Sequence, residues 1–218
     1  MQAMPHSQRW LKQLTALHGN QTENAIISRT QIHYHRLIAA DPPIIPRHPK
    51  AKKELTNLLY PGLALFRTLT EEDPDTTRVL ATNELLFKAE FFSGLGFGIG
   101  LINYLPDPFP IIRPILRMMI RSQYLPGSQV VVEDNLNCFA INTTRCFKLD
   151  VLTDLKARDL TSLYCKTDDW LSEKLPKVHW RRTKTLARGD EICDFRWCRQ
   201  DLPSLCLTRN SKKSNESI

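Results

Sequence analysis

The sequence lacks the features that mark several common classes of protein. Residues 1–7 are polar and have no apolar core segment, so nothing there resembles a signal peptide. The apolar run at residues 91–105 is too short to span a bilayer comfortably. No Cys-x-x-Cys pair occurs, which argues against a structural zinc site. The sequence therefore predicts a cytoplasmic protein with no transmembrane segment, no metal and no cofactor.

Six cysteines are present, and none has the spacing of a metal site. They stand at positions 138, 146, 165, 193, 198 and 206. Disulfides are rare in proteins that stay in a reducing compartment. Because no secretory route is indicated, we expect all six cysteines to be thiols.

Charge and composition favour a globular protein with a small-molecule partner. Apolar residues make up 42% of the 218 residues, which is enough for a core, and the net charge is a modest +7. The basic groups are not interleaved with aromatic residues, and no recognition helix accompanies them, so nucleic acid is not expected as a partner. A small anionic molecule or a negatively charged membrane surface would use the same charge. The sequence does not indicate an oligomeric state.

Glycines alternate with apolar residues at positions 94–100. This spacing does not fit a dinucleotide-binding loop, because that loop needs a strand before it and its third glycine three residues after the second. Small residues let another backbone come close, so we expect a tightly packed core segment. A role in lining an apolar substrate pocket is the alternative.

Hydrophobic periodicity indicates an α+β fold with the helices first. The predicted helices cover residues 7–14, 24–40, 50–69 with a kink at Pro61, 76–92, 111–124, and about 160–174. Alternating patterns predict strands at residues 130–133, 137–148, 178–186 and 192–197. The expected architecture is an N-terminal helical part packed on a small C-terminal antiparallel β-sheet with one inserted helix.

Proline and composition suggest the domain boundaries. Four prolines between residues 42 and 49 predict an extended hinge. We therefore expect an N-terminal arm at residues 1–45, a single catalytic-like α+β domain at 46–200, and a polar, disordered tail at 201–218.

Thiols and carboxylates are the chemistry candidates. Cys165 and Asp168 are three residues apart on a predicted helix, so they share a face. The spacing alone favours Cys165 as a small buried hydrophobe over a nucleophile, because buried thiols are common. Cys193 and Asp194 are neighbours on a predicted strand and point to opposite faces. Asp194 could act at a site or form a structural ion pair with Arg182 or Arg196.

Four short motifs resemble the L-2-amino-thiazoline-4-carboxylic acid hydrolase family. They are Thr144-Arg145-Cys146, then Tyr164-Cys165-x-x-Asp168, then Arg182-Thr183-x-Thr185-Leu186-x-x-Gly189, and last Cys193-Asp194-Phe195-Arg196. Each motif is short, but their order and spacing together are moderately specific. The resemblance covers residues 130–198.

The resemblance implies an α+β hydrolase that opens a cyclic C–N bond in a small carboxylated heterocycle. It also implies catalytic roles for Cys165, Asp168, Cys193 and Asp194, as nucleophile or proton carrier. The implied substrate-binding residues are Arg145, Cys146, Arg182, Thr183 and Thr185. An arginine such as Arg145 or Arg182 would hold the substrate carboxylate, because its planar fork binds two oxygens at once.

Two other functions stay open. The apolar segment at residues 91–105 is more hydrophobic than a site for a small polar substrate requires. This hydrophobicity fits a cyclase or isomerase acting on a hydrophobic metabolite in secondary metabolism. A non-catalytic small-molecule-binding protein is the third possibility.

Overall fold

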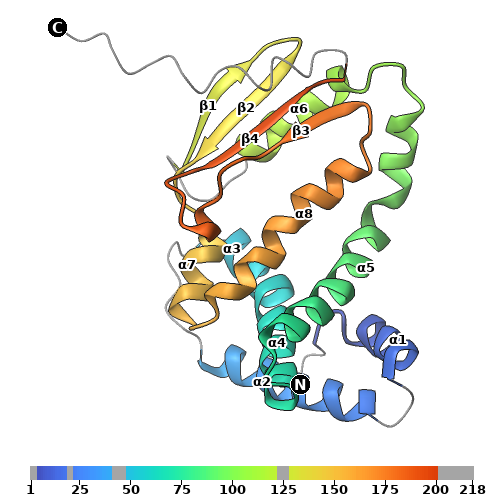
Figure 1. The fold of residues 1–218 in the computed structure, drawn as a ribbon, viewed down its shortest axis with the longest axis vertical. Helices are drawn as coiled ribbons and strands as arrows, with labels where there is room; N and C mark the ends of the chain where they lie inside the picture. The colour runs from blue at the N-terminus through green and yellow to red at the C-terminus, as the bar shows by residue number, and fades with distance from the viewer. Residues whose placement is uncertain (1–3, 19–21, 41–47, 122–127, 201–218) are drawn as a thin grey trace, which may run out of the picture. The chain divides into compact units, whose positions relative to one another are not determined.

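The computed structural model of the chain describes residues 4–18, 22–40, 48–121 and 128–200 (Figure 1). Two compact units are present. Unit 1 comprises residues 1–95 and 148–167, and unit 2 comprises residues 96–147 and 168–218. Each unit is described by itself below.

Helices make up the described part of unit 1. They are α1 Ser7–His18, α2 Thr22–Ala40, α3 Pro49–Glu54, a π-helical turn η1 Leu55–Leu59, α4 Tyr60–Glu72, the first part of α5 Thr76–Asn103, α7 Phe147–Asp154, η2 Arg158–Leu160 and the first part of α8 Thr161–Glu173. The helices predicted at residues 7–14, 24–40 and 76–92 are confirmed. A kink was predicted at Pro61. The structure has the π-helical turn η1 directly before α4, the helix that contains Pro61. The glycine run predicted as a packed segment continues α5.

The core of unit 1 joins α1 and α2 to the helices that follow them in sequence. The Trp10 ring lies 5.6 Å from the Phe87 ring, and Tyr34 donates a hydrogen bond to the Thr56 carbonyl at 3.2 Å. A Cβ atom at Gly62 would lie 2.7 Å from the Phe87 ring, so only glycine permits this approach. Of the predicted hinge, residues 42–47 lie outside the described residues, and Pro49 begins α3. The predicted tail also lies outside the described residues. The predicted division into arm, body and tail stays a prediction.

Unit 2 contains a four-stranded antiparallel sheet. Its strands are β1 Gln129–Asp134, β2 Cys138–Thr143, β3 Val178–Arg181 and β4 Cys193–Arg199, in the order β1-β2-β4-β3. The helical elements of unit 2 are the end of α5, α6 Phe109–Arg121 and the second part of α8. A mostly helical chain with a small antiparallel sheet in its C-terminal part confirms the predicted α+β class.

Alternation along β2 builds the core of unit 2. Phe139 and Ile141 point to one face, where they pack with Phe109, Ile112 and Leu116 of α6. Phe195 and Trp197 of β4 are paired in register with Ile141 and Phe139 and pack against the same cluster. The predicted alternation of residues 138–143 is therefore confirmed.

Two predicted strands are too long. The strand predicted to reach Lys148 ends at Thr143, because Thr143 pairs with the first residues of β1 and β4 and neither strand offers a further partner. Helix α7 begins at Phe147. The strand predicted over residues 178–186 ends at Arg181. The backbone N–H groups of Thr183 and Lys184 donate to the Asp194 carboxylate instead of to a strand, and a short 3-10 helix, η3 Leu186–Arg188, follows.

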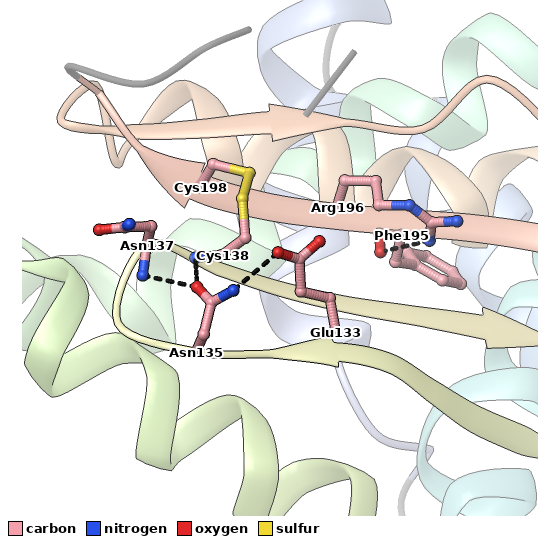
Figure 2. Close-up of a disulfide and its surroundings, with 7 residues drawn as sticks. All are labelled: Glu133, Asn135, Asn137, Cys138, Phe195, Arg196 and Cys198. Carbon is pink, nitrogen blue, oxygen red and sulfur yellow. Dashed lines mark hydrogen bonds between the residues drawn. A yellow bond between two sulfur atoms is a disulfide. The ribbon is translucent and has the colours of Figure 1, made fainter. Parts of the chain in front are cut away.

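The prediction that all six cysteines are thiols is wrong for two of them. Cys138 and Cys198 form a disulfide between β2 and β4, and each residue is 1% exposed (Figure 2). The strand register places these two residues directly opposite each other with their Cα atoms 4.2 Å apart. The two cysteines are 60 residues apart in the sequence, and this spacing did not predict that they would pair. Cys146, Cys165 and Cys193 are thiols, and Cys206 lies outside the described residues.

Within the described ranges, every helix is either too short or too polar to cross a lipid bilayer.

Candidate functional site

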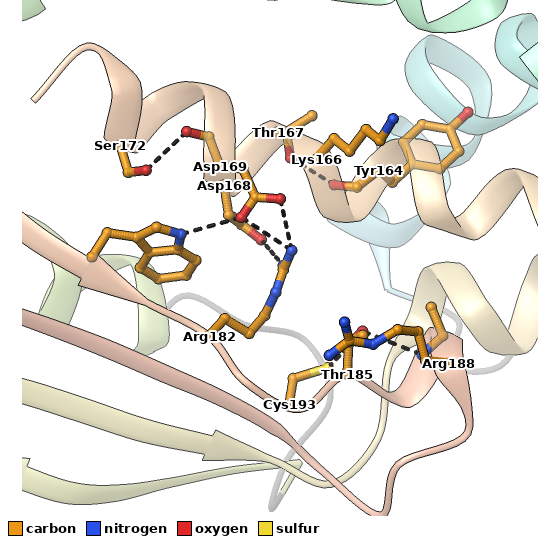
Figure 3. Close-up of polar contacts among 12 residues, drawn as sticks. Tyr164, Lys166, Thr167, Asp168, Asp169, Ser172, Arg182, Thr185, Arg188 and Cys193 are labelled. Carbon is orange, nitrogen blue, oxygen red and sulfur yellow. Dashed lines mark hydrogen bonds and ion pairs between the residues drawn. The ribbon is translucent and has the colours of Figure 1, made fainter. Parts of the chain in front are cut away.

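Arg182 lies between two carboxylates of α8 (Figure 3). Its Nη1 donates to Asp168 Oδ2 at 3.2 Å, and its Nη2 donates to both carboxylate oxygens of Asp169, at 3.2 and 3.0 Å. Arg182 follows β3 and Asp168 and Asp169 belong to the second part of α8, so the cluster lies within unit 2. One guanidinium is thus bound by two carboxylates.

Aromatic side chains complete this cluster. The indole N–H of Trp180 donates to Asp169 Oδ1 at 3.2 Å, and the Arg182 guanidinium carbon lies 5.8 Å from the ring centres of both Trp180 and Phe195. The Arg182 side chain is 10% exposed, whereas the side chains of Asp168 and Asp169 are 41% and 45% exposed. The two carboxylates are therefore the part of the cluster that a ligand reaches most easily.

Asp194 fixes the chain that follows β3. Its carboxylate accepts hydrogen bonds from the backbone N–H of Thr183 at 2.8 Å, from the Thr183 hydroxyl at 2.5 Å and from the backbone N–H of Lys184 at 2.5 Å. Burial by itself would raise the pKa of Asp194, but these hydrogen bonds and the charge of Arg196 outweigh it and hold the pKa below its ordinary value. Asp194 is therefore a buried, ionised anchor with an exposure of 3%.

Cys193 and Thr185 form the next contact along the same segment. The Cys193 sulfur accepts the backbone N–H of Leu186 at 3.2 Å and donates to the Thr185 hydroxyl at 3.6 Å. The backbone N–H of Thr185 donates to Asp190 at 2.7 Å. These contacts fix the position of the Cys193 sulfur beside Thr185 and Leu186.

The structure brings together several of the residues that sequence reasoning selected. The pairs are Asp168 with Arg182, Thr183 with Asp194, and Thr185 with Cys193.

The other three selected residues are placed elsewhere. Arg145 and Cys146 lie between β2 and α7, where Arg145 is exposed and Cys146 is half-buried. Cys165 is half-buried on α8, three residues before Asp168, and belongs to unit 1.

The ion pair considered between Asp194 and Arg182 is replaced by a different arrangement. Arg182 pairs with Asp168 and Asp169, and Arg196 donates to the Ile141 carbonyl and to Asn142 Oδ1. Trp180 and Phe195 were not selected as site residues. The predicted strand over residues 178–186 could have indicated Trp180. Residues two apart on a strand share a face, and Trp180 precedes Arg182 by two.

Among the residues that the structure describes, no group of three or more His, Cys, Asp or Glu side chains is placed to hold a metal ion.

Fold and site together define an α+β protein in which unit 2 gathers ionisable side chains from α8, from the residue after β3 and from β4. Residues 118–197 match the family model described as L-2-amino-thiazoline-4-carboxylic acid hydrolase, which confirms the resemblance noted in the sequence. The matched segment contains Asp168, Arg182, Thr185, Cys193 and Asp194.

The other comparisons are less informative. No curated protein matches the chain. Among solved structures, an Fe(II) unliganded H-NOX protein from K. algicida is 11% identical over 96% of this chain and 98% of its own, with a TM-score of 0.37. A mutant of that protein is 12% identical over 90% of this chain and 96% of its own, with a TM-score of 0.33. TM-scores this low do not establish a shared fold.

Proposed function

We propose that this protein is a small-molecule hydrolase that opens a cyclic C–N bond in a carboxylated heterocycle such as 2-aminothiazoline-4-carboxylate. The observation that carries the proposal is the family match over residues 118–197, which contains the cluster of Asp168, Asp169 and Arg182. Such a cluster supplies charged groups for binding and proton transfer at one place.

The two carboxylates suit the cationic part of such a substrate. A cyclic amidine is positively charged when protonated, and carboxylates bind planar N–H donors through two parallel hydrogen bonds. Asp168 and Asp169 are the exposed groups of the cluster, so we assign them to the amidine. Arg182 is already bound by both carboxylates and so positions them. Arg145, on the exposed segment after β2, is then the proposed partner of the substrate carboxylate.

A thiol would carry the covalent step. The thiolate of Cys193 or Cys165 adds to the amidine carbon, the ring C–N bond breaks, and the departing nitrogen takes a proton. Water then adds to the same carbon and displaces the thiol, so the reaction consumes one water in total. The Leu186 N–H holds the Cys193 sulfur in place. Asp194, with three hydrogen bonds to its carboxylate, positions residues 183–184 and is a poor proton acceptor because its pKa is low.

The test is incubation of the full-length protein with 2-aminothiazoline-4-carboxylate in ¹⁸O-labelled water. We expect carbamoyl-cysteine carrying one label, detected by mass spectrometry. Serine in place of the nucleophilic cysteine lowers kcat by about 10²-fold or more. The variants Cys193→Ser and Cys165→Ser therefore identify the nucleophile, with Ser162→Ala on the exposed face of α8 as the control. Asp168→Asn and Asp169→Asn are expected to raise KM.

Two results would count against this mechanism. Unchanged turnover in both cysteine variants would exclude a covalent step, and no turnover by the folded protein would exclude this substrate.

An isomerase or cyclase is the second candidate, because of the aromatic side chains on the sheet. The rings of Trp180 and Trp197 lie 4.9 Å apart, and those of Phe195 and Trp197 lie 5.8 Å apart, next to the Arg182 cluster. Aromatic surfaces of this kind hold apolar substrates in a reactive conformation. A product of the same mass as its substrate, with no label from water, would favour this reaction. Binding without any product would favour the non-catalytic alternative.

A further inference from the structure

An open cavity of about 360 Å³ lies in unit 2, away from the Arg182 cluster. Its lining residues come from the segment before α6, from the residue before β3 and from the end of β4: Pro106, Asp107, Lys177, Arg199 and Gln200. Lys177 and Arg182 stand on either side of β3, five residues apart. At about 3.3 Å per residue they are roughly 16 Å apart along the chain, and none of Asp168, Asp169 and Arg182 lines the cavity, so it is separate from the Arg182 cluster.

Both cations of the cavity are held in fixed positions. The Lys177 ammonium donates to the carbonyls of Asn103 at 3.0 Å and Leu105 at 2.7 Å, near the end of α5. An ammonium has three N–H donors, so these bonds leave one donor for a ligand. The Arg199 guanidinium pairs with Asp107 at 3.1 Å, which fixes its position at the cavity wall.

The backbone at Arg199 is also anchored. Its N–H donates to the Asn137 carbonyl at 3.0 Å, and the preceding residue, Cys198, is bonded to Cys138 (Figure 2). Groups that are already ordered lose little conformational entropy when a ligand binds. The two cations are therefore better placed to bind an anion than mobile surface lysines would be.

We propose that this cavity binds a small oxyanion, the carboxylate or phosphate group of a metabolite. Among the lining residues that the structure describes, Lys177 and Arg199 are positively charged and Asp107 is negatively charged. The planar fork of arginine matches the oxygens of either group. The volume is within the range of sites for small molecules, about 300–1,000 Å³. The site is independent of the proposed hydrolysis.

The experiment is calorimetric titration of the full-length protein with inorganic phosphate and, separately, with malonate. Tighter binding of one of them assigns the preferred group. Arg199→Gln and Lys177→Gln are each expected to weaken binding by about tenfold, because each removes one charged hydrogen-bond donor. Arg121→Gln, an exposed arginine of α6 outside the cavity, is the control and should change the Kd by less than about twofold.

A further variant covers the case in which Arg199→Gln or Lys177→Gln disturbs folding. Gln200→Glu adds a negative charge to the wall and is expected to weaken anion binding. It leaves in place the two hydrogen bonds of Lys177 and the ion pair of Arg199. Equal affinity of Gln200→Glu and the unaltered protein would overturn the proposal. So would an equal loss in Arg121→Gln, or the absence of saturable binding of both anions.

Discussion

Asp194 shows how hydrogen bonds decide what a single carboxylate does. The residue was selected from its sequence neighbour Cys193 as a proton carrier or an ion-pair partner. Its three hydrogen bonds are instead directed to it from Thr183 and Lys184, and they keep it ionised despite its burial. The residue thereby determines where β3 ends and how the next segment leaves the sheet.

Replacing Asp194 by asparagine is expected to destabilise the protein at neutral pH by about 2–3 kcal/mol, since hydrogen bonds to charged groups contribute that much. The folded-state pKa of Asp194 is lowered, so its stabilising effect is present above the pKa of the unfolded chain, about 3.9, and is lost as pH falls through the folded-state pKa. The free energies of unfolding of the two proteins should therefore converge below about pH 4. Urea unfolding at several pH values measures this, and a pH-independent difference would contradict it.

At the scale of elements, β2 and β4 form the most firmly connected pair in the sheet. They are paired in register along residues 138–143 and 193–198, and the disulfide closes their shared end. The loop that the disulfide closes contains α7, α8 and β3, and so all the residues of the Arg182 cluster. Fixing this loop lowers the entropy of the unfolded chain more than fixing a short one would.

The double variant Cys138→Ala/Cys198→Ala is expected to lose about 4 kcal/mol of stability, from the entropy of a closed loop of 60 residues. Chemical unfolding without reductant gives the measurement, and Cys146→Ala is the matched single-thiol control. A thiol count on the unfolded, unreduced protein should also rise when it is repeated after reduction. An equal count, or a double variant as stable as the control, would rule out the disulfide in solution.

At the scale of the whole molecule, the matched family segment is smaller than the compact unit that contains most of it. Residues 118–197 leave out Phe109, Ile112 and Leu116, which form the helical side of the core in unit 2. They also leave out Cys198 and therefore the disulfide. Each of the two units is built from two separate stretches of chain, so neither corresponds to a continuous piece of sequence.

A fragment of residues 118–197 is therefore expected not to fold by itself. Without the three α6 side chains, the apolar face of the sheet stays in water, and burying a large apolar side chain contributes about 1.5–3 kcal/mol. Near-ultraviolet circular dichroism and a thermal scan should show no cooperative transition for the fragment, with the full chain as the comparison. A sharp transition in the fragment would show that the matched segment is an independent domain.

The sequence by itself determined the α+β class, most of the helices, the alternation of β2 and the family resemblance. These depend on local periodicity or on short motifs, which are properties of neighbouring residues. Only the tertiary structure decided that Arg182 binds Asp168 and Asp169, that Asp194 holds Thr183, and that Cys138 is bonded to Cys198. Such pairings depend on strand order and register, and these are set when distant segments pack together, so residue spacing along the chain does not contain them.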